Sequence, residues 1–142
     1  MIDKIILADN KFDIVIFNRN LEKLFIDVID SIKKRDVDSI KNFVASDVYY
    51  KLNMMVNTYK EKNINRTFKN LNIKSIDIEK VDITDNFITI DTKIEVSFID
   101  SFKGYTTNNV YKIILTKRRV NNNYSEIDMR GYGYILTYID NI

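Results

Sequence analysis

The spacing of the apolar residues changes about halfway along this sequence, and that change limits what the chain can fold into. Up to roughly residue 62, apolar residues recur every three to four positions, as they do on one face of an α-helix. From roughly residue 71 onward, they alternate with polar residues, as in a strand with one buried face. A chain with its helices first and its strands afterwards is typical of the α+β class.

The first half predicts three helices. One amphipathic stripe has helical spacing and comprises Leu21, Leu24, Phe25, Val28 and Ile32. Asn18 or Asn20 can cap this helix through a side-chain oxygen. Asp36 or Asp38 can begin a second, short helix. A third helix, with Ser46 as its candidate cap, has a stripe of Val48, Leu52, Met55, Val56 and Tyr59.

The second half predicts four antiparallel strands. The clearest alternation covers residues 88–98, which are apolar on one side and mostly polar or charged on the other. Before it, residues 71–78 form a strand whose phase slips near Ser75, as at a β-bulge. After it, residues 110–116 form a third strand and residues 124–139 a fourth, bent at its glycines. Because long bent strands curl, we predict a curved four-stranded antiparallel sheet with three N-terminal helices on its concave face, a cone-shaped α+β roll.

Residue types that much enzyme chemistry requires are missing. The chain has no cysteine and no histidine, which excludes disulfides, thiolate zinc sites, thiol nucleophiles and the histidine-based catalytic triad. The sequence also contains no phosphate-binding loop and no spacing typical of metal ligands. We therefore predict a protein that is not an enzyme and binds neither a cofactor nor a metal ion.

Charge, hydropathy and composition set weaker limits. The net charge of +2 is too small to indicate nucleic-acid binding by itself. No apolar run approaches the roughly 20 residues of a transmembrane helix, so none is predicted. The start of the chain lacks the features of a secretory or transit peptide. Abundant Ile, Asn and Lys with little Ala or Gly indicate an AT-rich genome, so we expect an organelle-encoded protein or one from a bacterial endosymbiont.

Six segments carry a resemblance to a known family: Phe25 to Ile29, Lys34 to Lys41, Ser46 to Leu52, Asn70 to Ile78, Thr89 to Phe98, and Tyr134 to Leu136. Their order and their apolar and charged positions resemble the domain of the mitochondrial inner-membrane translocase subunit 44. That family includes bacterial relatives and members in the mitochondrial large ribosomal subunit. It lies within the nuclear-transport-factor-like, cystatin-like superfamily.

The resemblance covers roughly residues 17–139, so we predict an N-terminal extension over residues 1–16 and one domain over residues 17–142. It implies a non-enzymatic binding or structural module on the matrix side of the mitochondrial inner membrane. The expected partners are protein subunits of the mitoribosome large subunit, the import motor or a respiratory-chain complex. Two alternatives stay open: a small-molecule isomerase or dehydratase that uses the cone, and a peripheral adaptor on an anionic membrane.

Two groups of cations are candidate contacts for ribosomal RNA or anionic lipid headgroups. The first group, near the predicted third hairpin, comprises Lys112, Lys117, Arg118 and Arg119. The second group, between the helices and the sheet, comprises Lys60, Lys62, Arg66 and Lys69. The alternative for both groups is a set of cations that contact only solvent.

Tyrosines of the predicted last strand form a third candidate site. Tyr132, Tyr134 and Tyr138 would share one strand face and could bind a protein partner, or they could pack in the core. For the enzyme alternative, the candidate acid and base lie among four carboxylates on the first helix and the longest alternating strand. These are Asp27, Asp30, Asp91 and Glu95.

Overall fold

The computed structural model describes residues 1–119 and 134–142. The helical segments are α1 (Ile2–Ala8), α2 (Ile14–Lys34), the 3-10 helix η1 (Asp38–Phe43) and α3 (Ser46–Glu61). The strands are β1 (Phe68–Ile83), β2 (Phe87–Asp100), β3 (Thr106–Arg118) and β4 (Ile135–Ile139). The strands form one antiparallel sheet in the order β1-β2-β3-β4. The predicted α+β class and the meandering sheet are therefore confirmed.

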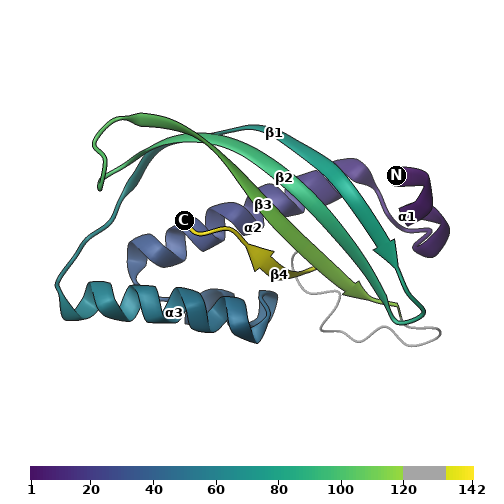
Figure 1. Cartoon of the computed structure of the whole chain (residues 1–142), viewed down its shortest axis with the longest axis horizontal. Helices are drawn as coiled ribbons and strands as arrows, with labels where there is room; N and C mark the ends of the chain where they lie inside the picture. Colours follow the sequence, from purple (N-terminus) through teal and green to yellow (C-terminus); the bar gives the residue numbers. More distant parts are fainter. Residues whose placement is uncertain (120–133) are drawn as a thin grey trace.

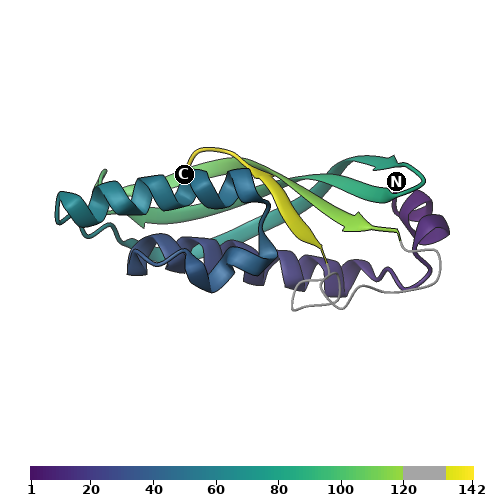
Figure 2. The ribbon, with the colours of Figure 1, turned by 90° about the horizontal axis from the view of Figure 1, so that it is seen from below.

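The sheet arches over the helices, which lie on its concave side (Figure 1). From below, α2 and α3 lie alongside one another and β4 crosses the same layer (Figure 2). The inner face of β2 alternates as predicted and is almost completely buried at Ile88, Ile90, Thr92, Ile94, Val96 and Phe98. Facing it, α2 buries Leu21, Leu24, Phe25, Val28 and Ile32. One core between the helices and the concave sheet face therefore holds the fold together.

The predicted irregularity in the first strand is present. The register of β1 against β2 shifts between Ile73 and Ser75, and it shifts at two further places, near Asn70 and Glu79. Because each bulge adds twist and bends its strand, these shifts explain how a 16-residue strand can follow a curved sheet.

Three helical predictions were wrong in detail. Helix α2 begins at Ile14, before the predicted caps, because Asp13 Oδ1 accepts hydrogen bonds from the backbone N–H groups of Val15 and Ile16, at 2.8 and 3.2 Å. The predicted second helix is a 3-10 helix of six residues, η1. Ser46, the predicted cap of the third helix, is instead the first residue of α3; Ala45 is the N-cap residue, and no side-chain oxygen caps the helix.

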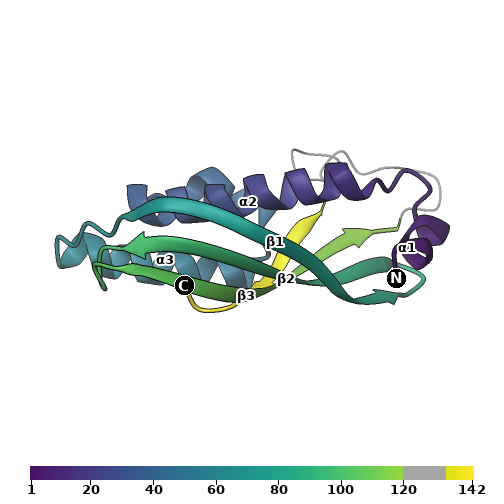
Figure 3. The same ribbon diagram turned by 90° about the horizontal axis from the view of Figure 1, so that it is seen from above.

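The first sixteen residues, expected as an extension, pack against the rest of the chain. Ile5 is completely buried in the common core. Lys4 Nζ donates a hydrogen bond to the carbonyl oxygen of Val81 in β1, at 3.0 Å. Asp9, the C-cap of α1, forms an ion pair with Lys117 in β3 at 2.8 Å. These contacts fix α1 at one end of the sheet (Figure 3).

Strand β4 is described over five residues only, and the predicted bend and hairpin before it lie outside the described residues. A register shift against β3 puts Ile114 opposite Tyr138 and Leu115 opposite Leu136. This shift changes the phase of the strand, so Leu136 and Ile139 are buried while Tyr138 is exposed. The sequence pattern gave no sign of this irregularity.

Candidate functional site

The strongest candidate for a binding surface lies on α1 and the first turn of α2. We call it the N-terminal apolar surface, and it comprises the exposed side chains of Ile2, Ile6, Leu7, Val15 and Ile16. Leu7 is 89% exposed. Large apolar side chains that gather on a surface, unlike single scattered ones, mark contacts with a partner or a membrane.

This surface is held rigidly because the opposite side of α1 is anchored. Ile5 is buried beneath it, and the contacts of Lys4 and Asp9 with the sheet fix both ends of the helix. Ile2, Ile6 and Leu7 are therefore held in exposed positions, because α1 cannot rotate to bury them. A fixed surface loses little conformational entropy when it binds.

A hollow of about 440 Å³ adjoins this surface, between α1, α2 and β1. Ile14 and Ile78 supply apolar walls, and Asp3 and Asp77 add carboxylates. Asn18 contributes a buried side-chain oxygen that has no hydrogen-bond partner. The hollow thus extends the apolar surface inward and ends near a polar group.

The sequence reasoning missed this surface, although a signal was present. Residues 5–8 and 14–17 are two apolar runs without a polar interruption. Four consecutive helical residues point in directions that span most of the circumference of a helix. A helix packed on one side cannot bury such a run completely, so each run predicts exposed apolar side chains.

The first predicted cation cluster is divided between the two faces of β3. Successive residues of a strand point to opposite faces, so Lys112 and Arg118 are exposed while Lys117 turns inward. The Lys117 ammonium pairs with Asp9 and lies 5.6 Å from the centre of the Tyr134 ring. Arg119 donates a hydrogen bond to the carbonyl oxygen of Thr84 at 2.8 Å. Lys117 is therefore wrong as a surface contact, because its charge is used inside the fold.

The second cluster loses Arg66 for the same reason. Its guanidinium is buried and pairs with the Asp100 carboxylate, while Nη1 donates to the Tyr59 hydroxyl at 3.2 Å. The rings of Phe68 and Phe102 lie on it, each 4.7 Å from Cζ. Arg66 joins α3 to the sheet and is wrong as a contact for RNA or lipid. The remaining members, Lys60, Lys62 and Lys69, are exposed.

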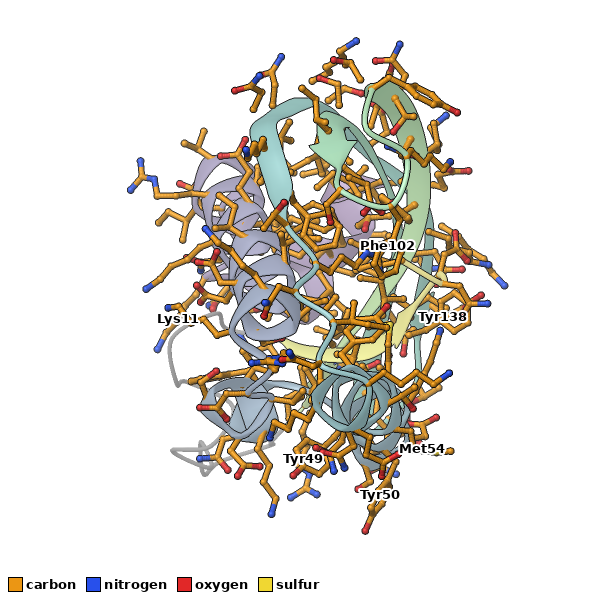
Figure 4. All side chains as sticks on the ribbon, turned by 90° about the vertical axis from the view of Figure 1, so that its left-hand side faces the viewer. Lys11, Tyr49, Tyr50, Met54, Phe102 and Tyr138 are labelled. Atoms are coloured by element: carbon orange, nitrogen blue, oxygen red, sulfur yellow. The ribbon has the colours of Figure 1, made fainter. Side chains whose placement is uncertain are left out.

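The tyrosine face predicted for the last strand does not exist as one surface. Tyr134 is buried, and its hydroxyl has no hydrogen-bond partner among residues 1–119 and 134–142. Burial, with a smaller effect of Asp9, raises the pKa of this hydroxyl well above its ordinary value. Tyr138 is 43% exposed and bonds to Asp140, and Tyr132 lies outside the described residues. Exposed aromatic and sulfur side chains lie instead on α3, where Figure 4 shows Tyr50 and Met54 pointing outward.

Away from the hollow beside α1, side chains of the described residues fill a gap between α2 and β3. The gap lined by Phe17, Leu21, Leu24, Leu115 and Tyr134 has no room for a water molecule. The carboxylates of the enzyme alternative do not meet there, because Asp91 and Glu95 lie on the face of β2 opposite to its buried side chains. Burial is the largest influence on Asp27 and raises its pKa, but Asp27 is only partly buried. Among residues 1–119 and 134–142, no group of three or more carboxylates could hold a metal ion.

The comparison with protein families finds a match over most of the chain. Residues 1–113 match the model of the Tim44-like domain. A search of the curated proteins found no match. In the described part of the chain, no helix combines the length and the apolar character needed to cross a membrane.

Proposed function

The chain belongs to the Tim44-like domain family, and from this premise we propose that it is a non-catalytic peripheral adaptor of the mitochondrial inner membrane. In this proposal it attaches to the inner membrane and holds one or more protein subunits of a larger assembly there. The family match, which agrees with the resemblance seen in the sequence, supports the setting. The observation that carries the mode of attachment is the N-terminal apolar surface.

The N-terminal apolar surface suits the boundary between headgroups and acyl chains. It lies on a short helix and the start of a second one, and its side chains are the aliphatic types that enter that layer. Lys11, in the turn between the two helices, and Arg19, in α2, are exposed near these segments and can approach anionic headgroups. In this proposal, attachment there replaces the surface cations of β3 as the route to the membrane, since Lys117 pairs with Asp9 and is largely buried.

Leu7 gives the sharpest test of this attachment. Transferring a nearly fully exposed leucine from water to an apolar layer contributes about 1.5–3 kcal/mol. We therefore expect Leu7→Gln to weaken binding to anionic vesicles by about tenfold or more in co-sedimentation. Met54→Gln is the matched control, because Met54 is also exposed and apolar but lies on α3. Equal binding by the wild type and Leu7→Gln would reject this surface as the membrane contact.

The adaptor role itself requires a second measurement. We expect the tagged chain to sediment with an inner-membrane protein assembly after mild detergent extraction, rather than as a monomer. A monomer in such extracts, with vesicle binding intact, would refute the adaptor role but not the membrane contact.

A further inference from the structure

A second surface lies at the end of the molecule opposite to α1. Figures 1 and 3 show the C-terminal end of α3, the start of β1 and the turn between β2 and β3 at this end, with the turn above the end of α3 in Figure 1. We call it the hairpin-end surface. It comprises Lys60, Lys62, Lys69, Phe102, Lys103 and Tyr105, all of them exposed.

These segments lie close together because hydrogen bonds and ring contacts join them. Thr67 N–H donates to Ser101 Oγ at 2.9 Å, and Ser101 N–H donates to the Thr67 carbonyl at 3.0 Å. The ring of Tyr59, next to Lys60, lies 5.7 Å from the ring of Phe102. Lys69 is opposite Ile99, near the end of β2. The end of α3 and the start of β1, which carry lysines, therefore adjoin the turn that carries Lys103.

The turn itself has a fixed shape. The N–H groups of Lys103 and Gly104 both donate to the carbonyl oxygen of Asp100, at 2.9 Å, and Phe102 N–H donates to the Asp100 side chain at 3.0 Å. Gly104 takes the left-handed conformation, with φ of +79°. Phe102 rests on Arg66 and Tyr59 on one side and is still 54% exposed, and Tyr105 is 63% exposed. Figure 4 looks at this end of the molecule and shows Phe102 above the end of α3.

The charge of this end is one-sided. Over residues 59–75 and 101–111 the sequence has six cations and a single exposed acid, Glu61. Arg66 is neutralised by Asp100, which leaves a positive rim of lysines around two exposed aromatic rings. Aromatic anchors at the centre and charged residues at the rim are the usual anatomy of a protein interface.

We propose that the hairpin-end surface binds an acidic protein segment that carries an apolar or aromatic side chain. The apolar side chain packs on Phe102 and Tyr105, and its carboxylates face Lys60, Lys62, Lys69 and Lys103. Complementary charge favours an acidic partner, and lysines at the rim raise the rate of encounter. A protein is favoured over RNA because the total charge of the chain is low for a nucleic-acid-binding domain. This proposal deepens the adaptor role and rests on it, since it gives the protein partner a place away from the membrane.

The test uses the full chain in solution with a fluorescent synthetic peptide of repeated Glu-Glu-Phe units. We expect saturable binding in fluorescence anisotropy that weakens as salt increases, and no binding of a matching Lys-Lys-Phe peptide. The triple variant Lys60→Gln, Lys62→Gln, Lys69→Gln should weaken binding about tenfold, and Tyr105→Ser should also weaken it. The matched control is Lys80→Gln with Lys93→Gln, which removes exposed lysines from β1 and β2 without changing binding.

The alternatives give different results in the same assay. Tighter binding of oligouridine or of anionic vesicles at these lysines would overturn the proposal in favour of RNA or a membrane. Equal binding by the triple variant and the wild type, or no peptide binding at all, would also overturn it. Vesicle binding through Leu7 is measured separately, so loss of the peptide site leaves the membrane contact intact.

A second readout uses the native assembly. A photo-reactive phenylalanine analogue in place of Tyr105 should cross-link to a partner peptide that is rich in Asp and Glu. A cross-linked peptide without excess acid, or a cross-link that ribonuclease removes, would contradict the proposal.

Discussion

The buried pair of Arg66 and Asp100 offers the clearest test of what holds the helices to the sheet. Each side chain is 8% exposed. Arg66 Nε lies 3.2 Å from both Asp100 oxygens, and Nη1 donates to the carbonyl oxygen of Ile142 at 3.1 Å. One guanidinium therefore ties together the end of β2 and the last residue, and through Tyr59 it also reaches α3.

The perturbation is Asp100→Asn, which keeps the shape of the side chain but removes its charge. The Arg66 guanidinium then stays buried without a counter-charge, which costs about 3–5 kcal/mol of unfolding free energy. For a domain with a total stability of about 5–15 kcal/mol, this loss is large. Replacing both partners, Arg66→Met with Asp100→Leu, removes the charge and its partner together and should recover most of the loss.

The assay is urea denaturation followed by circular dichroism, on the wild type, the single variant and the double variant. A loss below about 1 kcal/mol in Asp100→Asn would refute the reasoning, because a pair that weak behaves like a surface ion pair. A double variant as unstable as the single variant would also refute it, since packing rather than charge would then dominate.

The same pair predicts how stability changes with pH. Burial acts to raise the pKa of Asp100, but hydrogen bonds from Arg66 and from the Phe102 N–H lower it more, so the folded pKa lies below the ordinary value. The stabilisation is therefore present above the unfolded pKa of about 3.9 and is lost as pH falls through the folded pKa. Asp100→Asn lacks this contribution, so its stability should decrease less steeply below about pH 5.

Three further substitutions test other contacts by the same urea assay. Tyr134→Phe should leave the free energy of unfolding unchanged or raise it by up to about 1 kcal/mol, because the buried hydroxyl has no hydrogen-bond partner in the described part of the chain; a clear loss of stability would reveal one. Asp9→Ala should lower the free energy of unfolding by about 3 kcal/mol, since the Lys117 ammonium stays largely buried after the Asp9 carboxylate is removed. A loss near zero would contradict the role of this pair in fixing α1. Gly104→Ala should lower the free energy of unfolding by about 1 kcal/mol, because an alanine is strained at this positive φ. The loss should be no larger, since no atom lies within 4 Å of the added methyl group; a much larger loss would mean that the turn is packed.

The sequence predicted most of the fold because the core is built on simple periods. The stripe on α2 and the alternation on β2 each bury one face, and both were identified from spacing alone. The predictions were less accurate where the deciding interaction is local and polar. Asp13 rather than Asn18 or Asn20 caps α2, because its oxygen reaches two backbone N–H groups.

The candidate sites were predicted less well than the fold, because exposure depends on pairing between distant residues. Arg66 and Lys117 look like surface cations in the sequence, but their partners, Asp100 and Asp9, are 34 and 108 residues away. Tyr138 was assigned to the wrong face because one register shift changes the phase of β4. No spacing rule within a segment contains that information.

The positions of the two surfaces give the proposed adaptor a defined geometry. The N-terminal apolar surface lies at one end of the molecule, and the hairpin-end surface lies at the other. Helix α2 runs along the sheet between them for 21 residues, which corresponds to about 30 Å. Because α1 and the β2–β3 turn are each fixed by buried contacts, the domain acts as a rigid spacer. A partner at the hairpin-end surface would then be held about 30 Å from the membrane, beyond the Debye length of about 8 Å at physiological salt, so the two contacts should bind independently.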